Sequence, residues 1–324
     1  MLSRIFRKIL RFLFKPFIRK ELFEYSKLRS IISFDENCLS SKKTSNYIFN
    51  GLKSNVPMMI SRFGYTELNT LYRYENIIKM NKIEKIYQWA QTSAYPFTEN
   101  CILHNIHKLS GFYPVTEVTL KLFSEEMFES MKEINLLGSW VNGEELYKKY
   151  LTKAKVCELQ MLEPYFSSDP WSKALEGKKV LVIHPFSSLI RNQFKNNRKY
   201  IFKNKDILPD FELKTLQTPI TYPGSDSQSK TWFENLNKLT RDALKIDFEV
   251  ALLGCGAYGM PLAARLKKEG KISIHLGGSL QILFGIKGKR WDKIESFRKM
   301  YNEFWVYPSS EKVYNNVEDG CYWK

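Results

Sequence analysis

The residues best suited to chemistry in this sequence form a glycine-rich stretch, Gly254-Cys255-Gly256-Ala257-Tyr258-Gly259, with the spacing G-x-G-x-x-G. An apolar run before it predicts a strand, and an amphipathic segment after it predicts a helix. A tight turn between a strand and a helix places backbone N–H groups at the helix N-terminus, where they bind phosphate. The motif therefore predicts that Gly254, Gly256, Tyr258 and Gly259 bind a nucleotide. The alternative is that the glycines only allow close packing of helix against strand.

A dinucleotide-binding enzyme usually carries an Asp or Glu about twenty residues further on, where it binds the ribose. Here the next apolar run ends in His275-Leu276-Gly277-Gly278, without an acid. The missing acid counts against NAD(P). We expect His275, Gly277 and Gly278 to line the nucleotide site. Lys287 follows in a basic stretch and is predicted to contact the phosphates, although such a stretch also suits an ordinary solvated turn.

Two further polar clusters follow apolar runs. The first contains Arg62, Gly64 and Glu67, and the second begins at His184. Arg62 offers a planar donor fork to a diphosphate. Glu67 is suited to hold a divalent cation or to deprotonate an acceptor hydroxyl, and His184 is a second catalytic candidate. The alternatives are an ion pair between Arg62 and Glu67 and a His184 that only caps its strand.

These candidates need a common scaffold, which the hydrophobic pattern supplies. The predicted strands are 57–61, 179–183, 211–220, 248–253 and 272–276, and the predicted helices include 66–72, 231–246 and 259–269. Strands that alternate with helices imply an α/β fold with a Rossmann-like, mostly parallel sheet. Ligands of such sheets bind beyond the carboxyl ends of the strands, so we expect Arg62, His184 and Gly256 to meet at one edge. One catalytic domain is expected over 26–324, with a helical insertion over about 84–170.

Composition narrows the class of protein. The chain has 324 residues, of which 44% are hydrophobic, and this is enough for a large core. Its five cysteines are scattered and lack paired spacing, which argues against a secreted disulfide framework or a zinc site. The net charge is +16, but no zinc-finger, RNP or helix-turn-helix signature accompanies it, so nucleic-acid binding is not expected.

Much of the positive charge lies in residues 1–20. This segment contains seven Lys and Arg residues and no Asp or Glu. On a helical wheel the basic residues through Arg19 occupy one side, and Leu, Ile and Phe side chains occupy the other. Such a helix suits the surface of an anionic membrane, so residues 1–25 are predicted to be a membrane-surface arm. Two alternatives remain: the apolar side docks on the body, or the segment is an organelle presequence.

Taken together, four stretches of the sequence resemble the bacterial GT-D-fold-like family, whose members are assigned mainly as glycosyltransferases. They are Ser61-Arg62-Phe63-Gly64-x-x-Glu67, Val182-Ile183-His184-Pro185-Phe186, Leu253-Gly254-Cys255-Gly256-Ala257-Tyr258-Gly259-Met260-Pro261-Leu262 and Ile274-His275-Leu276-Gly277-Gly278-x-Leu280-Gln281-x-Leu283-Phe284-Gly285-Ile286-Lys287-Gly288. The resemblance covers about 55–292 and leaves the arm out. It implies a GT-D-like fold and transfer of a sugar from a nucleotide-sugar donor.

The resemblance also implies a divalent cation, Mn²⁺ or Mg²⁺. Relatives of this fold carry an Asp-x-Glu metal motif directly after Arg-Phe-Gly. The matching positions here are Tyr65 and Glu67, so the Glu is retained as the candidate metal ligand and the Asp is missing. This departure leaves metal dependence open.

The sequence thus predicts a glycosyltransferase with Glu67 and His184 as catalytic residues. A nucleotide-sugar donor, a glycan or lipid-linked acceptor and an anionic membrane surface are its expected partners, and polysaccharide biosynthesis is its expected setting. The expected location is cytoplasmic, peripheral on the inner face of the cell membrane. An NAD(P)-dependent oxidoreductase and a non-catalytic nucleotide-sugar-binding protein are the alternatives.

Overall fold

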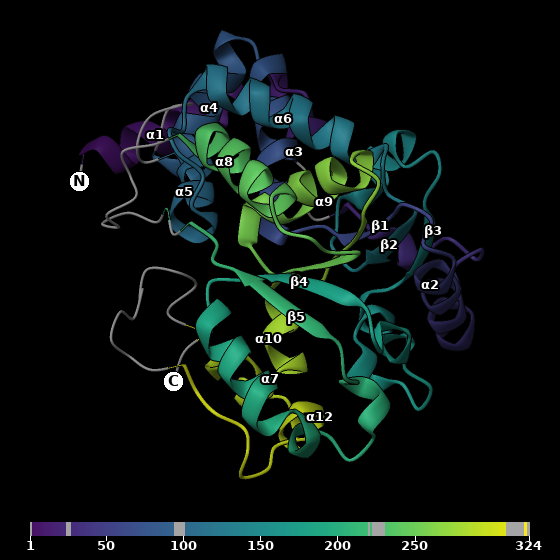
Figure 1. Cartoon of the computed structure of the whole chain (residues 1–324). Coiled ribbons are helices and arrows are strands. Elements are labelled where there is room, and N and C mark those ends of the chain that lie inside the picture. The colour runs from purple at the N-terminus through teal and green to yellow at the C-terminus, as the bar shows by residue number, and fades with distance from the viewer. Residues whose placement is uncertain are drawn as a thin grey trace.

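The computed structural model describes residues 2–23, 27–93, 101–219, 221, 231–308 and 321–322. Within these residues seven strands form one sheet, in the order β3-β2-β1-β7-β6-β4-β5, and every pair is parallel (Figure 1). The strands are β1 Met58–Arg62, β2 Leu136–Ser139, β3 Lys155–Glu158, β4 Lys179–Ile183, β5 Glu212–Leu216, β6 Val250–Leu253 and β7 Ile272–His275. The predicted α/β fold with a mostly parallel sheet is confirmed.

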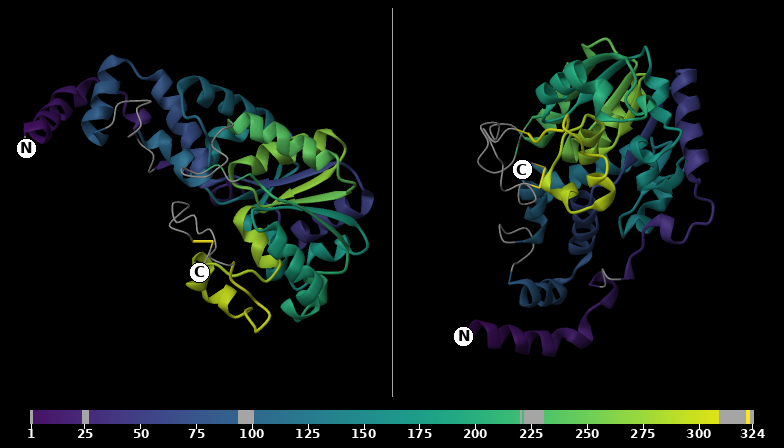
Figure 2. Two further views of the ribbon diagram at one scale, coloured as in Figure 1. Left: turned by 60° about the vertical axis from the view of Figure 1, so that its left-hand side comes forward. Right: turned by 90° about the horizontal axis from the view of Figure 1, so that it is seen from below.

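Helices cover both faces of the sheet (Figures 1 and 2). They are α1 Leu2–Phe14, α2 Ser41–Ser54, α3 Tyr65–Lys79, α4 Lys82–Thr92, α5 Asn105–Ser110, α6 Glu117–Met131, α7 Ser187–Ile201, α8 Trp232–Leu244, α9 Gly259–Lys268, α10 Leu280–Leu283, α11 Lys289–Asp292 and α12 Glu295–Arg298. In β4, Leu181 and Ile183 join the core under α3, α6, α8 and α9, whereas Val180 and Val182 join the core on the α2, α7 and α10 side. Burial on both faces explains why the central strands are continuous apolar runs.

The prediction of a helical insertion over 84–170 is wrong in its second half. Helices α4, α5 and α6 lie in this segment, but β2 and β3 follow them and extend the sheet beyond β1. Both strands have only four residues, and β3 has exposed Lys and Glu side chains at its ends. Pairing of β2 with β1 and of β3 with β2 holds them in place, and β2 is closely packed: a Cβ atom on Gly138 would lie 2.6 Å from Leu162 Cδ1. Strands this short do not produce a hydrophobic pattern from which they could be predicted.

The strand order creates a crevice at the carboxyl edge of the sheet. From β4 the chain moves outward to β5 and then returns to place β6 on the other side of β4. At such a switch point the connections leave in opposite directions and open a space between the strand ends, where α/β proteins bind ligands. The loops after β4, β6, β7 and β1 all start at this edge.

The N-terminal arm is helical, as predicted, but shorter. After α1 the chain continues in a 3₁₀ turn over Lys15–Phe17 that contains Pro16, and Arg19 lies beyond it in extended backbone. Arg19 therefore does not belong to the basic side of the helix. Its guanidinium pairs with Glu84 at 2.7 Å, and this contact lowers the pKa of the Glu84 carboxyl to about 2 and ties the arm to α4. Within the described residues, none of the helices has the length and apolar character of a membrane span.

Candidate active site

Loops from four neighbouring strands line one cleft at the carboxyl edge of the sheet, which we call the strand-end cleft. Arg62 comes from the end of β1, His184 from β4, Gly256 from the loop after β6 and His275 from β7. The cleft holds about 1230 Å³ of empty space, part of it open to solvent. The predicted convergence of three distant sequence stretches is thus confirmed. Glu67, Gly64, Gly254, Tyr258, Gly277 and Gly278 line the same cleft.

The guanidinium of Arg62 is the most unusual group in the cleft. Its Nε atom is buried and has no hydrogen-bond partner among the described residues. Burial lowers the pKa of Arg62, against the opposing effects of Tyr322 and Glu67, which raise it. A buried polar atom without a hydrogen-bond partner is costly, so an unsatisfied Nε in a cleft points to a contact that a ligand could supply.

Trp140 holds Arg62 in place. The guanidinium lies over the Trp140 ring, 4.7 Å from its centroid, and the indole N–H donates to the Phe63 carbonyl at 2.9 Å. The backbone N–H of Trp140 in turn donates to the buried carboxylate of Glu144 at 3.0 Å. The sequence analysis did not select Trp140, because the short strand β2 that ends just before it was not predicted. A fixed ring face under the guanidinium keeps its donor edge oriented before any ligand binds.

The glycines of the motif meet two different structural requirements. Gly256 has φ of 56°, which favours glycine, and a Cβ atom there would meet nothing closer than 4.0 Å. Gly254 and Gly259 instead allow close packing, because a Cβ atom would lie 2.6 Å from His184 Cδ2 or 2.1 Å from His275 Nε2, respectively. Gly259 does not line the cleft, so its predicted contact with the nucleotide finds no support in the geometry.

The turn at Gly256 opens a helical segment, first a 3₁₀ turn at Gly256–Tyr258 and then α9. The first N–H groups of such a segment have no acceptor within it and attract anions. Tyr258 lines the cleft, but its ring stacks on Trp232 and its hydroxyl hydrogen-bonds to Thr221 at 3.1 Å. The backbone of this turn is therefore better placed for an anion than the Tyr258 hydroxyl.

The two histidines of the cleft are neutral. Burial lowers the pKa of both His184 and His275 to about 3, and Arg62 adds to the effect at His275. His184 accepts the Phe186 N–H through Nδ1 at 3.0 Å, so Nε2 carries its proton. This arrangement favours a structural and hydrogen-bonding role for His184 over proton transfer, and its catalytic role stays a prediction. His275 contacts Ser61 Oγ through Nδ1 at 3.1 Å.

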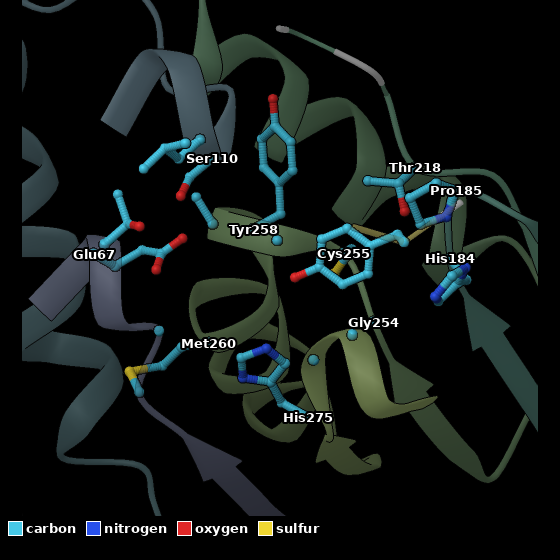
Figure 3. Close-up of a pocket in the computed structure, with 18 of the residues that line it drawn as sticks. Glu67, Ser110, His184, Pro185, Thr218, Gly254, Cys255, Tyr258, Met260 and His275 are labelled. Atoms are coloured by element: carbon cyan, nitrogen blue, oxygen red, sulfur yellow. The ribbon is translucent and has the colours of Figure 1, made fainter. Parts of the chain in front are cut away.

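Glu67 and His184 approach the cleft from opposite sides, with Gly254, Cys255 and Tyr258 between them (Figure 3). Glu67 is in the first turn of α3 and is 8% exposed. Its carboxylate folds back over Gly64, where a Cβ atom would overlap Oε2 at 1.8 Å. The absence of a side chain at position 64 thus allows the carboxylate to lie at the cleft wall.

The described residues that line the cleft do not offer the ligand set of a divalent cation. Glu67 is the one carboxylate among its described lining residues, and no three His, Cys, Asp or Glu side chains in the described part of the chain are grouped to hold a metal. Tyr65, at the position of the missing Asp, is 52% exposed and brings no carboxylate. Arg62 and Arg290 add positive charge to the same lining. The Mn²⁺ or Mg²⁺ implied by the sequence resemblance therefore does not fit these residues.

Lys287 is not part of the cleft, contrary to prediction. Its ammonium group lies over the rings of Tyr301 and Tyr307, 5.1 and 5.4 Å from their centroids. The aromatic faces attract the cation and direct it away from the strand ends. Arg290, three residues later, lines the cleft instead, together with Tyr322. Arg290 was visible in the sequence as part of the same basic stretch, whereas nothing in the sequence pointed to Tyr322.

Glu163 does not line the cleft, but its carboxyl is close enough to Arg62 for the positive charge to affect its pKa. Burial raises the pKa of its carboxyl from an ordinary 4.5 to about 7, although hydrogen bonding by Ser279 and the charge of Arg62 oppose this. A carboxyl with a raised pKa in the folded state stabilises the fold at low pH, and this contribution is lost as the pH rises through about 7.

Replacing Glu163 by Gln should remove this pH dependence. Relative to the wild type, we expect Glu163→Gln to gain about 2 to 3 kcal/mol in free energy of unfolding between pH 5 and pH 8, from a pKa difference of roughly 2.5 units. Urea denaturation over this pH range measures the difference. Parallel curves for the two proteins would show that the pKa of Glu163 in the folded state is close to its ordinary value and is not raised.

No protein-family model and no curated protein matches this chain. Solved structures similar to it include two of domain of unknown function 1792. One is its selenomethionine-substituted form, with 15% identity, a TM-score of 0.35, and coverage of 75% of this chain and 78% of that chain. The other is described as having a distinct glycosyltransferase fold, with 16% identity, a TM-score of 0.35, and coverage of 74% and 78%. A likeness at this level concerns the arrangement of the chain and not its substrate.

Proposed function

We propose that this protein is a glycosyltransferase that binds a nucleoside-diphosphate sugar in the strand-end cleft. The observation that carries the proposal is the buried guanidinium of Arg62. Its Nε lacks a hydrogen-bond partner in the described part of the chain, and it shares a cleft with the Gly256 turn and Glu67. A guanidinium fork and helix-terminal N–H groups are both donors suited to phosphate oxygens. The diphosphate is proposed to lie between them.

The neutral side chains around the cleft suit the remaining parts of the donor. We place the nucleoside toward His184 and Thr218, and the sugar toward Glu67, because Figure 3 shows these residues on opposite sides of the glycine turn. The sequence resemblance to the GT-D-fold-like family is what favours a sugar nucleotide over other anionic ligands. The acceptor is proposed to be a hydroxyl of a glycan or of a lipid-linked glycan.

In this proposal Glu67 is the general base. The acceptor oxygen forms a bond to the anomeric carbon, and the bond from that carbon to the phosphate oxygen breaks. The leaving nucleoside diphosphate takes the electron pair and remains on Arg62 and the Gly256 turn, while the acceptor proton passes to the Glu67 carboxylate. A base positioned in this way contributes about 10² to 10⁴ in rate.

A ligand screen separates this function from the two alternatives. Thermal shift and calorimetry with UDP-, GDP- and dTDP-sugars should show binding, whereas CMP-sugars, which carry one phosphate, serve as the control. Tighter binding of NAD(P) than of every diphosphate sugar would favour the oxidoreductase. Binding of a diphosphate sugar without release of the nucleoside diphosphate, with or without added glycan acceptors, would favour the non-catalytic binder.

We further propose that α1 holds the enzyme on an anionic membrane surface, on the cytoplasmic side. The helix lies against α4 yet leaves Ile5, Phe6, Ile9, Phe12 and Leu13 between 49% and 81% exposed. This exposure of the apolar side supports a contact with lipid over docking on the body. Figure 2 shows α1 at the end of the molecule, away from the sheet. Basic side chains on the same helix provide charge complementarity to acidic lipids.

Replacing Phe6, Ile9, Phe12 and Leu13 together by Ser should weaken binding to phosphatidylglycerol vesicles about hundredfold, because partly exposed side chains lose their apolar contact with the lipid. Vesicle sedimentation measures the binding. The matched control replaces Val118 and Leu122 by Ser, since these side chains on α6 are also exposed, at 68% and 46%. Equal sedimentation of the α1 variant and the wild type would disprove the membrane role of α1.

A further inference from the structure

The described lining of the cleft contains one carboxylate, Glu67, and two arginines, Arg62 and Arg290, and this balance of charge bears on how a diphosphate is held. Arg62 and Arg290 are close enough that the charge of Arg290 lowers the pKa of Arg62, after the larger effect of burial. Like charges that face each other repel, and an anion placed between them relieves the repulsion. A nucleoside-diphosphate sugar carries two negative charges on its two phosphates, which the two guanidinium groups match.

Arg290 has a partner that directs it toward the cleft. Its guanidinium NH1 donates to the Tyr322 hydroxyl at 3.2 Å, and its backbone N–H donates to the Cys321 carbonyl at 3.0 Å. Gln281 Nε2 lies within 3.4 Å of the Tyr322 carbonyl. Tyr322, which lies 32 positions after Arg290 in the sequence, is thus held against α11 at the cleft.

Two glycines make room for this contact. A Cβ atom on Gly278 would lie 2.4 Å from the Tyr322 ring, and one on Gly288 would lie 3.0 Å from the Cys321 and Tyr322 carbonyl oxygens. Neither glycine needs its conformational freedom, because neither has positive φ. Their lack of a side chain instead permits the segment Cys321–Tyr322 to approach the cleft closely. The position of Tyr322 at the cleft therefore depends on the close packing of this segment against the residues that precede α10 and α11.

We propose that Arg62 and Arg290, with Tyr322 holding the latter, neutralise the donor diphosphate in place of a divalent cation, so that donor binding is independent of metal. The inference rests on the proposed function and deepens it. The same residues that do not fit a metal supply the positive charge that a metal would bring. Guanidinium forks bind phosphate oxygens in two-point contacts and keep their charge at every physiological pH. Arg290 and Tyr322 thereby become part of the donor site.

Calorimetric titration of the full chain with UDP, GDP, CDP and dTDP tests this proposal, once with excess EDTA and once with added Mn²⁺ or Mg²⁺. For the nucleotide that binds best, we expect dissociation constants that agree within about threefold in the three buffers. Arg290→Ala should weaken binding about tenfold or more in EDTA, as expected for loss of a charge-assisted hydrogen bond. Tyr322→Phe should weaken it by a smaller factor, because Arg290 keeps its charge and loses only its orientation.

Lys289→Ala is the matched control, because it removes the same charge from the neighbouring position, which does not line the cleft. Its dissociation constant should stay at the wild-type value. Binding that requires Mn²⁺ or Mg²⁺, or that tightens tenfold or more when either ion is added, would overturn the inference and leave the proposed function standing. Absence of nucleoside-diphosphate binding in every buffer would overturn both.

Discussion

Replacing Glu67 by Gln is expected to lower the turnover number for sugar transfer by two to four orders of magnitude. The carboxamide has nearly the same shape as the carboxylate and fits against Gly64, but it does not accept the proton of the acceptor hydroxyl. The dissociation constant of the donor should change little, because the phosphates are held by other groups. Release of nucleoside diphosphate in the presence of acceptor measures the turnover.

A control on the same helix shows whether the effect belongs to the cleft. Glu75→Gln changes a glutamate of α3 that does not line the cleft and accepts the Tyr147 hydroxyl at 2.9 Å. A carboxamide oxygen accepts this bond as well, so turnover should remain at the wild-type value. If Glu67→Gln kept turnover within a few-fold of the wild type, Glu67 would be a helix-end residue and not the base.

Replacing Arg62 by Met should weaken donor binding by about hundredfold or more, which corresponds to about 2.7 kcal/mol. Two charge-assisted hydrogen bonds to a phosphate are lost, and each contributes about 1.5 to 3 kcal/mol. The Met side chain still packs on the Trp140 ring. Arg62→Lys keeps the charge without the planar fork, so its affinity should fall between those of Met and Arg. Calorimetry with the best-binding nucleoside diphosphate measures all three proteins.

The same substitution should not destabilise the protein in the absence of ligand. Burial lowers the pKa of Arg62, and its Nε has no hydrogen-bond partner among the residues that the structure describes, so burying this charge destabilises the fold. We expect the free energy of unfolding of Arg62→Met to be unchanged or raised by about 1 to 2 kcal/mol. A variant that is less stable yet binds the donor normally would assign Arg62 to the fold and remove it from the site.

The central strands were predictable because their burial leaves a clear sequence signal. Strands β4, β6 and β7 lie between two helical layers. Each is mostly apolar, with Ser273 as the polar residue inside β7, and each is followed by a polar cluster or by glycine. Once these runs are taken as parallel strands, their carboxyl ends must share an edge. The convergence of Arg62, His184 and Gly256 follows from that single geometric rule.

The features that could not be predicted from the sequence depend on packing between residues far apart in the chain. Strand β2 is short and contains Gly138, so it lacks the run of apolar side chains that marks a central strand. Without β2 there was no reason to select Trp140, which supports Arg62. Tyr322 reaches the cleft because Gly278 and Gly288 have no side chains that would block it. These glycines are far from Tyr322 in the sequence, so a local pattern does not reveal the contact. Lys287 carried the right charge, but two tyrosine rings hold it elsewhere.

The glycine motif shows how one pattern serves two needs. Gly256 takes positive φ at the start of a helical turn, where the phosphate is proposed to bind. Gly254 and Gly259 make room for His184 and His275, which are neutral and buried. Because both uses need glycine, the spacing alone did not distinguish them.

A structure determined with a bound nucleoside diphosphate tests the central claim most directly. We predict phosphate oxygens within hydrogen-bond distance of the Arg62 guanidinium and of the backbone N–H groups at Gly256 and Ala257, with Glu67 on the side where the sugar would lie. A nucleotide bound away from the strand ends, or one whose phosphates make no contact with Arg62, would contradict the account.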